Sequence, residues 1–359
     1  MNDLSPHPEA FDASHDDLFT YAESLGYGEL HLKMDPKTGL RAIIAIHDLT
    51  LGPAVGGCRC MHYDSTQEAI RDALRLAQMM TYKAAISGLP HGGGKSVLIQ
   101  PDVIRDRQAY FNAFGEFVDS LNGRYITAMD SGTCTDDMDA IAQKTSYVTC
   151  AENHFNQDGD PSPFTARGVL RGIEAAVKHK LGRKDIEGIR VVVQGVGHVG
   201  YNLVKGLQER GVRVTVCDTD DGLVRKCVHD FKVQSIAPEA VYETDCDVFA
   251  PCALGAVLSR TNIEKIKAPI IAGGANNQLA QPEDGEFIHQ RGILYAPDFV
   301  INAGGLMRVA YTYDGESLEK INEEVEHIHD TLLNIFERSA REDLPTSKIA
   351  EILALERLK

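Results

Sequence analysis

Residues 189–200 read Ile-Arg-Val-Val-Val-Gln-Gly-Val-Gly-His-Val-Gly, and this stretch decides the fold of the second half of the chain. The β-branched run 189–194 predicts a buried strand, which leads directly into a turn with three closely spaced glycines. A helix with apolar residues at helical spacing follows the turn, and residues 212–217 then predict a second strand that ends at Asp218. This complete order of strand, turn, helix and strand predicts a dinucleotide-binding unit, for which a glycine pattern alone would be weak evidence.

The turn and the end of the second strand supply the predicted contacts to the dinucleotide. Gly195 would form the tight turn, Gly197 would let the backbone approach the pyrophosphate, and Gly200 would let the helix pack against the strand. Asp218 would bind the adenosine ribose and repel a 2′-phosphate, so we expect NAD as the cofactor. The alternative is a Rossmann-type domain that has lost or changed its cofactor. A helix start offers N–H groups to phosphate, and we also expect His198, at this helix start, to lie at the surface. The cofactor-binding candidates are therefore the turn and helix start together with the acid after the second strand: Gly195, Val196, Gly197, His198, Val199, Gly200 and Asp218.

The domain organisation follows from chain length and from the alternation of strands with helices. Strands at 247–250, 269–272 and 293–296 continue the pattern and predict a parallel sheet covered by helices. The 359 residues are too many for one core, so we predict an α/β protein with two domains separated by a cleft: an N-terminal mixed α/β domain and a Rossmann-type, doubly wound dinucleotide-binding domain. The predicted boundaries are 1–150 plus 331–359 for substrate binding and oligomerisation and 151–330 for NAD binding, with a linker at 153–162.

The remaining elements are predicted from hydrophobic periodicity and capping signals. Ser65 and Glu68 form a capping-box pair at the start of a helix expected to run from Thr66 to about Met80. The other expected elements are strands at 40–47 and 96–99, a strand running into a loop at 125–135, and helices at 108–121, 165–181, 317–340 and from Ser347.

Charge and cysteine content exclude several classes of protein. The net charge of -16 disfavours nucleic acid or an anionic membrane as a partner. The polar, acidic residues 1–17 do not resemble a signal peptide, and no run is apolar and long enough to span a bilayer, so we expect a cytoplasmic protein. The eight cysteines are scattered and form no C-x-x-C pair, which indicates reduced thiols and no metal site.

A second unusual stretch, Gly88-Leu-Pro-His-Gly-Gly-Gly-Lys-Ser96, points to a substrate site. A phosphate-binding loop requires four residues between its first glycine and Gly-Lys-Ser, whereas Gly88 leaves five, and the preceding element is helical; we therefore reject an ATPase. The other interpretation is that the glycines admit a small substrate on which Lys83 and Lys95 converge. Adjacent ammonium groups favour each other's neutral form, so one lysine could act as a base while the other binds a carboxylate. Asp130 could stabilise a cationic imine and move protons. Each residue taken singly is more often a surface lysine or a capping aspartate, and sequence spacing alone does not bring the three together.

Several longer stretches carry a resemblance to a known family. The chain resembles the leucine, valine and phenylalanine dehydrogenases of the glutamate dehydrogenase superfamily. The stretches that carry the resemblance, in family order, are 51–59 (LGPAVGGCR), 72–77 (DALRLA), 80–83 (MTYK), 92–95 (GGGK), 125–128 (YITA), 161–166 (PSPFTA), 251–256 (PCALGA), 275–279 (ANNQL) and 295–305 (YAPDFVINAGG).

The resemblance implies roles for individual residues. Lys83 would bind the substrate α-carboxylate beside Gly56 and Gly57, and Lys95, assisted by Asp130, would be the general base that activates water. Asn276 and Asn277 would contact nicotinamide ribose or substrate, and the sequence does not separate their roles; Thr165 and Ala253 would contact the cofactor.

The implied reaction is an oxidative deamination of an L-amino acid to a 2-oxo acid and ammonia. The pocket for the substrate side chain would be apolar and formed by Val55, Ala128, Leu306 and Val309. Glutamate is therefore disfavoured as a substrate, because its side-chain carboxylate would be buried without a partner. Leucine, with isoleucine and valine, is the expected substrate, and phenylalanine is the main rival. The chain departs from the family pattern at several positions, and these departures concern the range of substrates more than the reaction. They are Met79, Met80, Met129, His91, Cys60 and Arg308. The resemblance also implies a homo-oligomer with its interface on the first domain.

Two other hypotheses remain open at this point. A 2-hydroxy acid dehydrogenase would use a histidine with an acidic partner, and we find no histidine in such a context. A non-catalytic NAD-binding regulatory protein would bind nucleotide without turnover.

Overall fold

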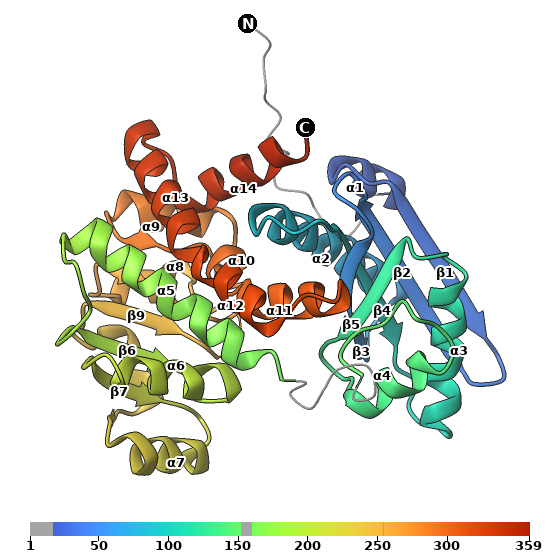
Figure 1. Cartoon of the computed structure of the whole chain (residues 1–359), viewed down its shortest axis with the longest axis horizontal. Helices are drawn as coiled ribbons and strands as arrows, with labels where there is room; N and C mark the ends of the chain where they lie inside the picture. The colour runs from blue at the N-terminus through green and yellow to red at the C-terminus, as the bar shows by residue number, and fades with distance from the viewer. Residues whose placement is uncertain (1–16, 152–159, 254) are drawn as a thin grey trace, which may run out of the picture. The chain divides into compact units, whose positions relative to one another are not determined.

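The computed structural model describes residues 17–151, 160–253 and 255–359, which form two compact units. The first unit contains residues 17–84 and 90–151, and the second contains residues 85–89 and the chain from Asp160 onward. Both are α/β units, as predicted (Figure 1). The predictions for the N-terminal stretch, and for most of the linker at 153–162, lie outside the described residues. Among the helices of the described part, none is long and apolar enough to cross a bilayer.

The first unit is built on a mixed five-stranded sheet with the order β1-β2-β4-β3-β5. β2 pairs antiparallel with β1 and β4, whereas β3 lies between β4 and β5 and runs parallel to both. The strand predicted at 40–47 is confirmed as β2. The bounds are β1 Glu29–Asp35, β2 Leu40–Asp48, β3 Ala54–Met61, β4 Gly92–Ile99 and β5 Tyr125–Met129.

Helices cover both faces of this sheet. The long helix α2 (Thr66–Ile86) buries Ala69, Ala73 and Ala77 against Val97 and Ile99 of β4. The opposite face is covered by the aromatic side of α3 (Arg107–Asp119), next to α4 (Thr135–Ala142); α1 (Leu18–Ser24) precedes the sheet. The expected cap of α2 is present, because the Ser65 hydroxyl accepts the Glu68 N–H at 3.1 Å, although the Glu68 carboxylate reaches back to the N–H of Asp64.

The glycine-rich segment differs from its prediction. We expected a strand only from residue 96, but β4 begins at Gly92 and its glycines lie in the middle of the sheet. A Cβ on Gly93 would lie 2.0 Å from the backbone nitrogen of Thr81, and one on Gly94 would lie 2.8 Å from the ring of Tyr125. Close packing on both faces explains the glycines, and it also removes the β-branched signal by which a strand is recognised.

The second unit contains the predicted Rossmann-type sheet. Its six strands are parallel and have the order β11-β10-β9-β6-β7-β8, so the strand order reverses between β6 and β9. The five predicted strands are confirmed and a short sixth, β8, is added. The bounds are β6 Arg190–Gln194, β7 Arg213–Cys217, β8 Gln234–Ser235, β9 Val248–Pro251, β10 Ile270–Ile271 and β11 Leu294–Tyr295. Ligands bind at the carboxyl ends of strands where such an order reverses.

The helices of the second unit form its two covering layers. On one face of the sheet, α8 and α9 pack against Phe249 and Ile271. In the other layer, α5 packs against α6, α11, α12 and α13. The bounds are α5 Ser162–Leu181, α6 His198–Gln208, α7 Asp221–Phe231, the 3₁₀ helix Pro238–Glu243, α8 Arg260–Lys265, α9 Glu283–Gln290, α10 Asp298–Ile301, α11 Gly304–Tyr313, α12 Leu318–Glu326, α13 Ile328–Glu342 and α14 Thr346–Arg357.

The C-terminal helices differ from the prediction in two ways. The helix expected at 317–340 is two helices, α12 and α13, which meet at His327. Residues 331–359, which we attached to the first domain, lie in the second unit. The physical reason is burial: α13 packs its apolar side on α5, and the Thr346 hydroxyl at the start of α14 donates to the Tyr295 carbonyl at 2.7 Å (Figure 1).

Candidate functional site

One face of the first sheet collects the residues predicted to handle substrate. Side chains alternate along a strand, so Val55, Gly57 and Arg59 of β3 share a face. Ala128 of β5 is paired with Gly57 and so points to the same face of the sheet. On β4, Lys95 is two residues before Val97, which packs against α2, so the two side chains point to the same face. The structure therefore places Val55, Gly57, Lys95 and Ala128 on the face that α2 covers.

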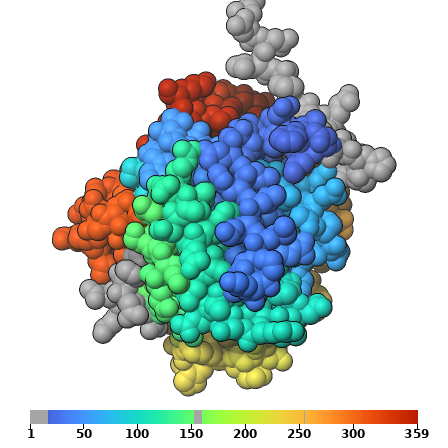
Figure 2. Space-filling view, turned by 90° about the vertical axis from the view of Figure 1, so that its right-hand side faces the viewer, coloured from blue at the N-terminus to red at the C-terminus, as the bar shows by residue number. Residues whose placement is uncertain are grey.

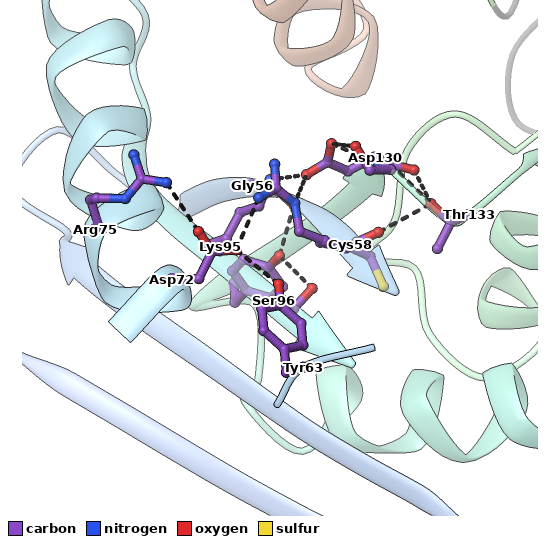
Figure 3. Close-up of polar contacts among 12 residues, drawn as sticks. Gly56, Cys58, Tyr63, Asp72, Arg75, Lys95, Ser96, Asp130 and Thr133 are labelled. Atoms are coloured by element: carbon purple, nitrogen blue, oxygen red, sulfur yellow. Dashed lines mark hydrogen bonds and ion pairs between the residues drawn. The ribbon is translucent and has the colours of Figure 1, made fainter. Parts of the chain in front are cut away.

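The centre of this face is an ion pair between Lys95 and Asp130. The Lys95 ammonium contacts Oδ2 of Asp130, and the two side chains are 7% and 21% exposed (Figure 3). The other carboxylate oxygen accepts the N–H of Ser131 at 2.7 Å. Burial alone would raise the pKa of Asp130, but the charges of Lys95 and Arg59 outweigh burial and lower that pKa to about 2. Asp130 is therefore a fixed anion at neutral pH, which suits it to stabilise a cation.

The two glycines of β3 are required by their surroundings. A Cβ on Gly57 would lie 3.1 Å from the Lys95 Nζ, and a Cβ on Gly56 would lie 1.8 Å from the Gly94 carbonyl oxygen. Gly57 thus leaves room for the ion pair, and Gly56 lets β3 approach β4. Both were predicted next to the substrate; the structure adds that they shape the site itself.

Lys83 lies on the helix that covers this face. It is half-buried near the end of α2, two residues after Thr81, whose backbone lies over Gly93 of β4. Because β4 also carries Lys95, the two lysines come from elements that pack against each other. The convergence of the two lysines on one substrate stays a prediction.

The dinucleotide turn fits the group it is predicted to hold. Gly195 follows β6 with φ +93°, and a Cβ there would lie 2.7 Å from the backbone nitrogen of Ala253, which follows β9. A Cβ on Gly200 would lie 1.9 Å from the Gly195 carbonyl oxygen, whereas a Cβ on Gly197 would meet nothing within 4 Å. The turn is thus tight where it meets protein and open at Gly197, as a cradle for pyrophosphate must be.

The predicted ribose contact is tied to the same turn. Asp218 follows β7 and its carboxylate accepts the N–H of Val196 at 2.8 Å and that of Asp220 at 3.0 Å. His198 begins α6, is exposed as expected, and lies 3.3 Å from Asp160; Val199 follows it, and its side chain lies against Gly274.

The other predicted residues of the second unit lie on α5, on α11 and in the loop after β10. Thr165 of α5 is so close to Gly305 of α11 that a Cβ on Gly305 would lie 2.5 Å from its hydroxyl oxygen. Leu306 and Val309 are half-buried on α11. Asn276 and Asn277 are both exposed and are distinguished by two features. Asn277 has a positive φ of 50°, and Asn276 accepts a hydrogen bond of 2.7 Å from Asn302.

Three residues near these sites were not singled out from the sequence. Arg59 and Asp72 form an ion pair of 2.9 Å next to Asp130, and buried Asn302 orients Asn276. All three stand inside the stretches that carry the family resemblance, which is the only signal in the sequence that could have identified them.

The fold and the arrangement of residues agree with comparisons to known proteins. The dimerisation domain of Glu/Leu/Phe/Val dehydrogenases matches residues 28–147, and the Glutamate/Leucine/Phenylalanine/Valine dehydrogenase model matches residues 160–227 and 224–359. Leucine dehydrogenase of Geobacillus stearothermophilus is 46% identical over 343 residues, covering 96% of this chain and 94% of that protein.

Relatives with other substrates are also similar. The crystal structure of L-tryptophan dehydrogenase from Nostoc punctiforme has a TM-score of 0.85 and 41% identity, covering 95% of this chain and 98% of that one. A hetero-hexameric glutamate dehydrogenase from Thermus thermophilus, with a TM-score of 0.74 over 95% and 94% of the two chains, is 22% identical and shares the fold. The chain therefore belongs to the glutamate/leucine/phenylalanine/valine dehydrogenase family and is an amino acid dehydrogenase, an oxidoreductase that works with a nicotinamide dinucleotide.

Proposed function

We propose that this enzyme catalyses the reversible, NAD-dependent oxidative deamination of an aliphatic L-amino acid, leucine first and also isoleucine and valine, to the 2-oxo acid and ammonia. The observation that carries the proposal is the buried Lys95–Asp130 pair beside Gly57, on the sheet face that also presents Val55 and Ala128. This face offers an amine, a fixed anion and small apolar side chains, which are what the deamination of an apolar amino acid needs.

The residues of the first unit handle charge and protons in this proposal. The ammonium of Lys83 binds the substrate carboxylate, and Lys95 takes a proton from the water that attacks the substrate imine. Asp130 stabilises the positive charge of the imine and of Lys95 through electrostatic attraction. When bound, the nicotinamide ring supplies the redox chemistry by accepting a hydride from the substrate Cα. The first unit would then be the substrate-binding domain and the second unit the NAD-binding domain.

The preference for NAD rests on Asp218. Its carboxylate is held by two backbone N–H groups at the end of β7, the position at which an acidic residue binds the ribose hydroxyls and repels a 2′-phosphate. The remaining predicted contacts, from Thr165, Ala253 and Asn276, complete the proposed cofactor site, and Asn277 is assigned to the substrate.

The preference for leucine rests on two observations. The relatives that are 46% identical are leucine dehydrogenases, compared with 41% for an L-tryptophan dehydrogenase and 38% for a phenylalanine dehydrogenase. The residues proposed to contact the substrate side chain are apolar in each unit: Val55 and Ala128 in the first, Leu306 and Val309 in the second. Among apolar side chains one methylene contributes only about 1–3 kcal/mol to discrimination, so an aromatic substrate is the main rival.

One assay tests the proposal. Formation of the reduced dinucleotide is followed by its absorbance with leucine, isoleucine, valine, phenylalanine, tryptophan and glutamate, each with NAD and with NADP. We expect the highest kcat/KM with leucine and NAD, and no detectable rate with glutamate. A higher kcat/KM with phenylalanine or tryptophan would overturn the substrate assignment. In the same assay Lys95→Ala should lose nearly all turnover while still binding NADH, and a variant that kept most of its kcat would contradict the assigned base.

We also propose a cytoplasmic homo-oligomer whose interface includes β1. This strand ends the sheet order, and the blue N-terminal region that contains it lies on the face shown in Figure 2. Leu32 and Met34 of this strand are 59% and 75% exposed. An unpaired edge with exposed apolar side chains favours association. The eight free thiols are those that a reducing compartment maintains. Light scattering should show a multimer, and Leu32→Glu with Met34→Glu should lower its mass; a monomeric wild type would refute the assembly.

A further inference from the structure

Arg59 connects the Lys95–Asp130 pair to the helix that covers it. Its side chain lies on the same face of β3 as Gly57, and its Nη1 forms an ion pair of 2.9 Å with Oδ2 of Asp72 on α2. Its Nε lies 3.6 Å from Oδ2 of Asp130, is buried, and has no hydrogen-bond partner among the residues that the structure describes. An N–H···O bond spans about 2.7–3.2 Å, so a movement of about half an ångström would complete this one.

Lys95 and Arg59 face the same oxygen atom. The Lys95 ammonium contacts Oδ2 of Asp130, which is also the oxygen nearest to the Arg59 Nε. The other oxygen of that carboxylate is already engaged by the N–H and hydroxyl of Ser131. Oδ2 therefore lies between two cations, one of which can lose its proton and one of which cannot.

Asp72 holds Arg59 in this position. Its carboxylate also accepts the Tyr63 hydroxyl at 2.8 Å and Nη2 of Arg75 at 3.0 Å (Figure 3). Burial would lower the pKa of Arg59, but the charges of Asp130 and Asp72 outweigh burial and raise it, so the guanidinium stays charged. The result is an alternating series of charges from the solvent-exposed Arg75 inward to Lys95.

We propose that Arg59 is a positioning residue for the reaction: it pairs with Asp130 when Lys95 becomes a neutral amine, and Asp72 anchors it for this purpose. The inference rests on the proposed role of Lys95 as general base. A buried carboxylate that loses its only cation is costly, because little solvent is present to stabilise it. With Arg59 present, loss of the Lys95 proton leaves Asp130 paired. Without Arg59, the same step would leave it alone, so Lys95 would hold its proton more tightly.

Besides Lys83 on α2, four titratable neighbours of the pair among the described residues keep one charge state near neutral pH. On β3 and β5, burial raises the pKa of the Cys58 thiol and of the Tyr125 hydroxyl, so both stay neutral. Next to α2, burial and the charge of Asp72 raise the pKa of the Tyr63 hydroxyl. Burial also raises the pKa of Asp72, but the charge of Arg59, the hydrogen bond from Tyr63 and the charge of Arg75 outweigh burial and lower that pKa, so Asp72 stays ionised. Lys83 is unchanged in every variant below, so a shift of the limb between variants reports the change made next to Lys95 and Asp130.

The test is the dependence of kcat/KM on pH for the full-length enzyme with leucine and NAD. Arg59→Gln should move the acid limb of the profile to higher pH by about one unit, because a cation within about 6 Å is removed; kcat/KM on that limb then falls about tenfold. Asp72→Asn removes the anchor of Arg59 and should move the limb in the same direction as Arg59→Gln, by a smaller amount. Arg59→Lys, which keeps the charge, should restore the limb toward the wild-type position.

Arg75→Gln is the matched control. It removes a cation from the same Asp72 carboxylate, but the Arg75 side chain is 47% exposed, so solvent screening should leave the limb in place. NADH affinity should be unchanged in all four variants. If Arg59→Gln lowers kcat/KM equally at every pH, Arg59 has only a structural role and the proposal is overturned.

The remaining outcomes separate this inference from the proposed function. If Arg59→Gln fails to fold, Asp72→Asn and Arg59→Lys decide, and an unmoved limb in Asp72→Asn overturns the proposal. If Lys95→Ala keeps its turnover, the general base is misassigned and the proposed function fails with it. If Lys95→Ala is inactive and the acid limb does not move in Arg59→Gln or in Asp72→Asn, only the inference about Arg59 fails.

Discussion

Gly57 lies so close to Asp130 that a Cβ atom added to the glycine would be 2.7 Å from the Cβ of the aspartate. Parallel pairing of β3 with β5 sets this distance, since Gly57 is the register partner of Ala128, two residues before Asp130. The carboxylate that holds Lys95 thus rests on a position where only a glycine leaves room.

The first prediction follows from this contact. Gly57→Ala should push Asp130 away from Lys95, and a displacement of about 1 Å at a reacting group can lower the rate about 100-fold. We expect kcat to fall by that order while NADH affinity is unchanged. Gly28→Ala is the control, since its Cβ would meet only ordinary contacts at 3.6 Å. A Gly57→Ala enzyme with wild-type kcat would contradict the packing argument.

The glycines of the dinucleotide turn should separate folding from cofactor binding. A Cβ on Gly200 would lie 1.9 Å from a backbone oxygen, so Gly200→Ala should lower the melting temperature of the enzyme without cofactor. A Cβ on Gly197 meets no protein atom within 4 Å, so Gly197→Ala should keep that temperature but lose most of the stabilisation by NADH. At an NADH concentration of about 100 times its Kd, this stabilisation is about 2.7 kcal/mol. Thermal unfolding with and without NADH measures both, and an unchanged NADH response would refute the pyrophosphate contact.

Asp218 should control the choice between the two dinucleotides. Asp218→Ala removes a charge that repels a 2′-phosphate, so the ratio of kcat/KM for NAD to that for NADP should fall, by about tenfold or more. Asp220→Ala is the matched control: Asp220 caps α7, so its loss should cost about 1 kcal/mol of stability and leave the ratio unchanged. Unchanged selectivity in Asp218→Ala would remove the ribose assignment.

Asn302 and Asn276 should act as a coupled pair. Asn302 is 3% exposed and donates to the Asn276 side-chain oxygen at 2.7 Å and to the Ala275 carbonyl at 3.4 Å, so Asn302→Ala removes this donor from both acceptors. We expect a loss of about 1–3 kcal/mol in the free energy of unfolding and a lower kcat/KM. In a double-mutant cycle with Asn276→Ala, the two losses of kcat/KM should overlap. Fully additive losses would show that Asn302 does not act through Asn276.

The cysteines should differ sharply in reactivity. Cys134 is the exposed thiol, at the start of α4, whereas burial raises the pKa of the Cys246 and Cys252 thiols to about 12. Titration of the native enzyme with a thiol-reactive disulfide at about pH 8, close to the ordinary thiol pKa, should therefore show one fast-reacting group. Cys134→Ser should abolish the fast phase. A fast phase that survives in this variant would mean that a buried thiol becomes accessible.

Predictability from the sequence differed between the two sheets for a physical reason. The strands of the second unit are buried on both faces, so β6 reads as an unbroken β-branched run and was recognised at once. In the first unit β3 and β4 carry glycines at 56, 57, 92, 93 and 94 where other strands carry branched side chains. Their extended form is set by neighbouring strands and by α2, so β3 was missed and β4 was placed too late.

The helices show the same division between local and tertiary signals. The Ser65 cap and the apolar spacing of α2 are local and were predicted. The break at His327 and the packing of α13 and α14 in the second unit were not, because one amphipathic stripe can be buried by any apolar surface of suitable shape. Which surface is chosen depends on the whole fold.

The sequence by itself determined the dinucleotide turn and the parallel sheet behind it, because local spacing and residue type carry those signals. The reacting amine and acid were proposed from the family resemblance. Only the tertiary structure decided that Lys95 and Asp130, 35 residues apart, touch each other over Gly57, and that Arg59 faces the same oxygen. These contacts run across paired strands, and strand pairing is settled by burial and close approach of backbones that no local pattern records.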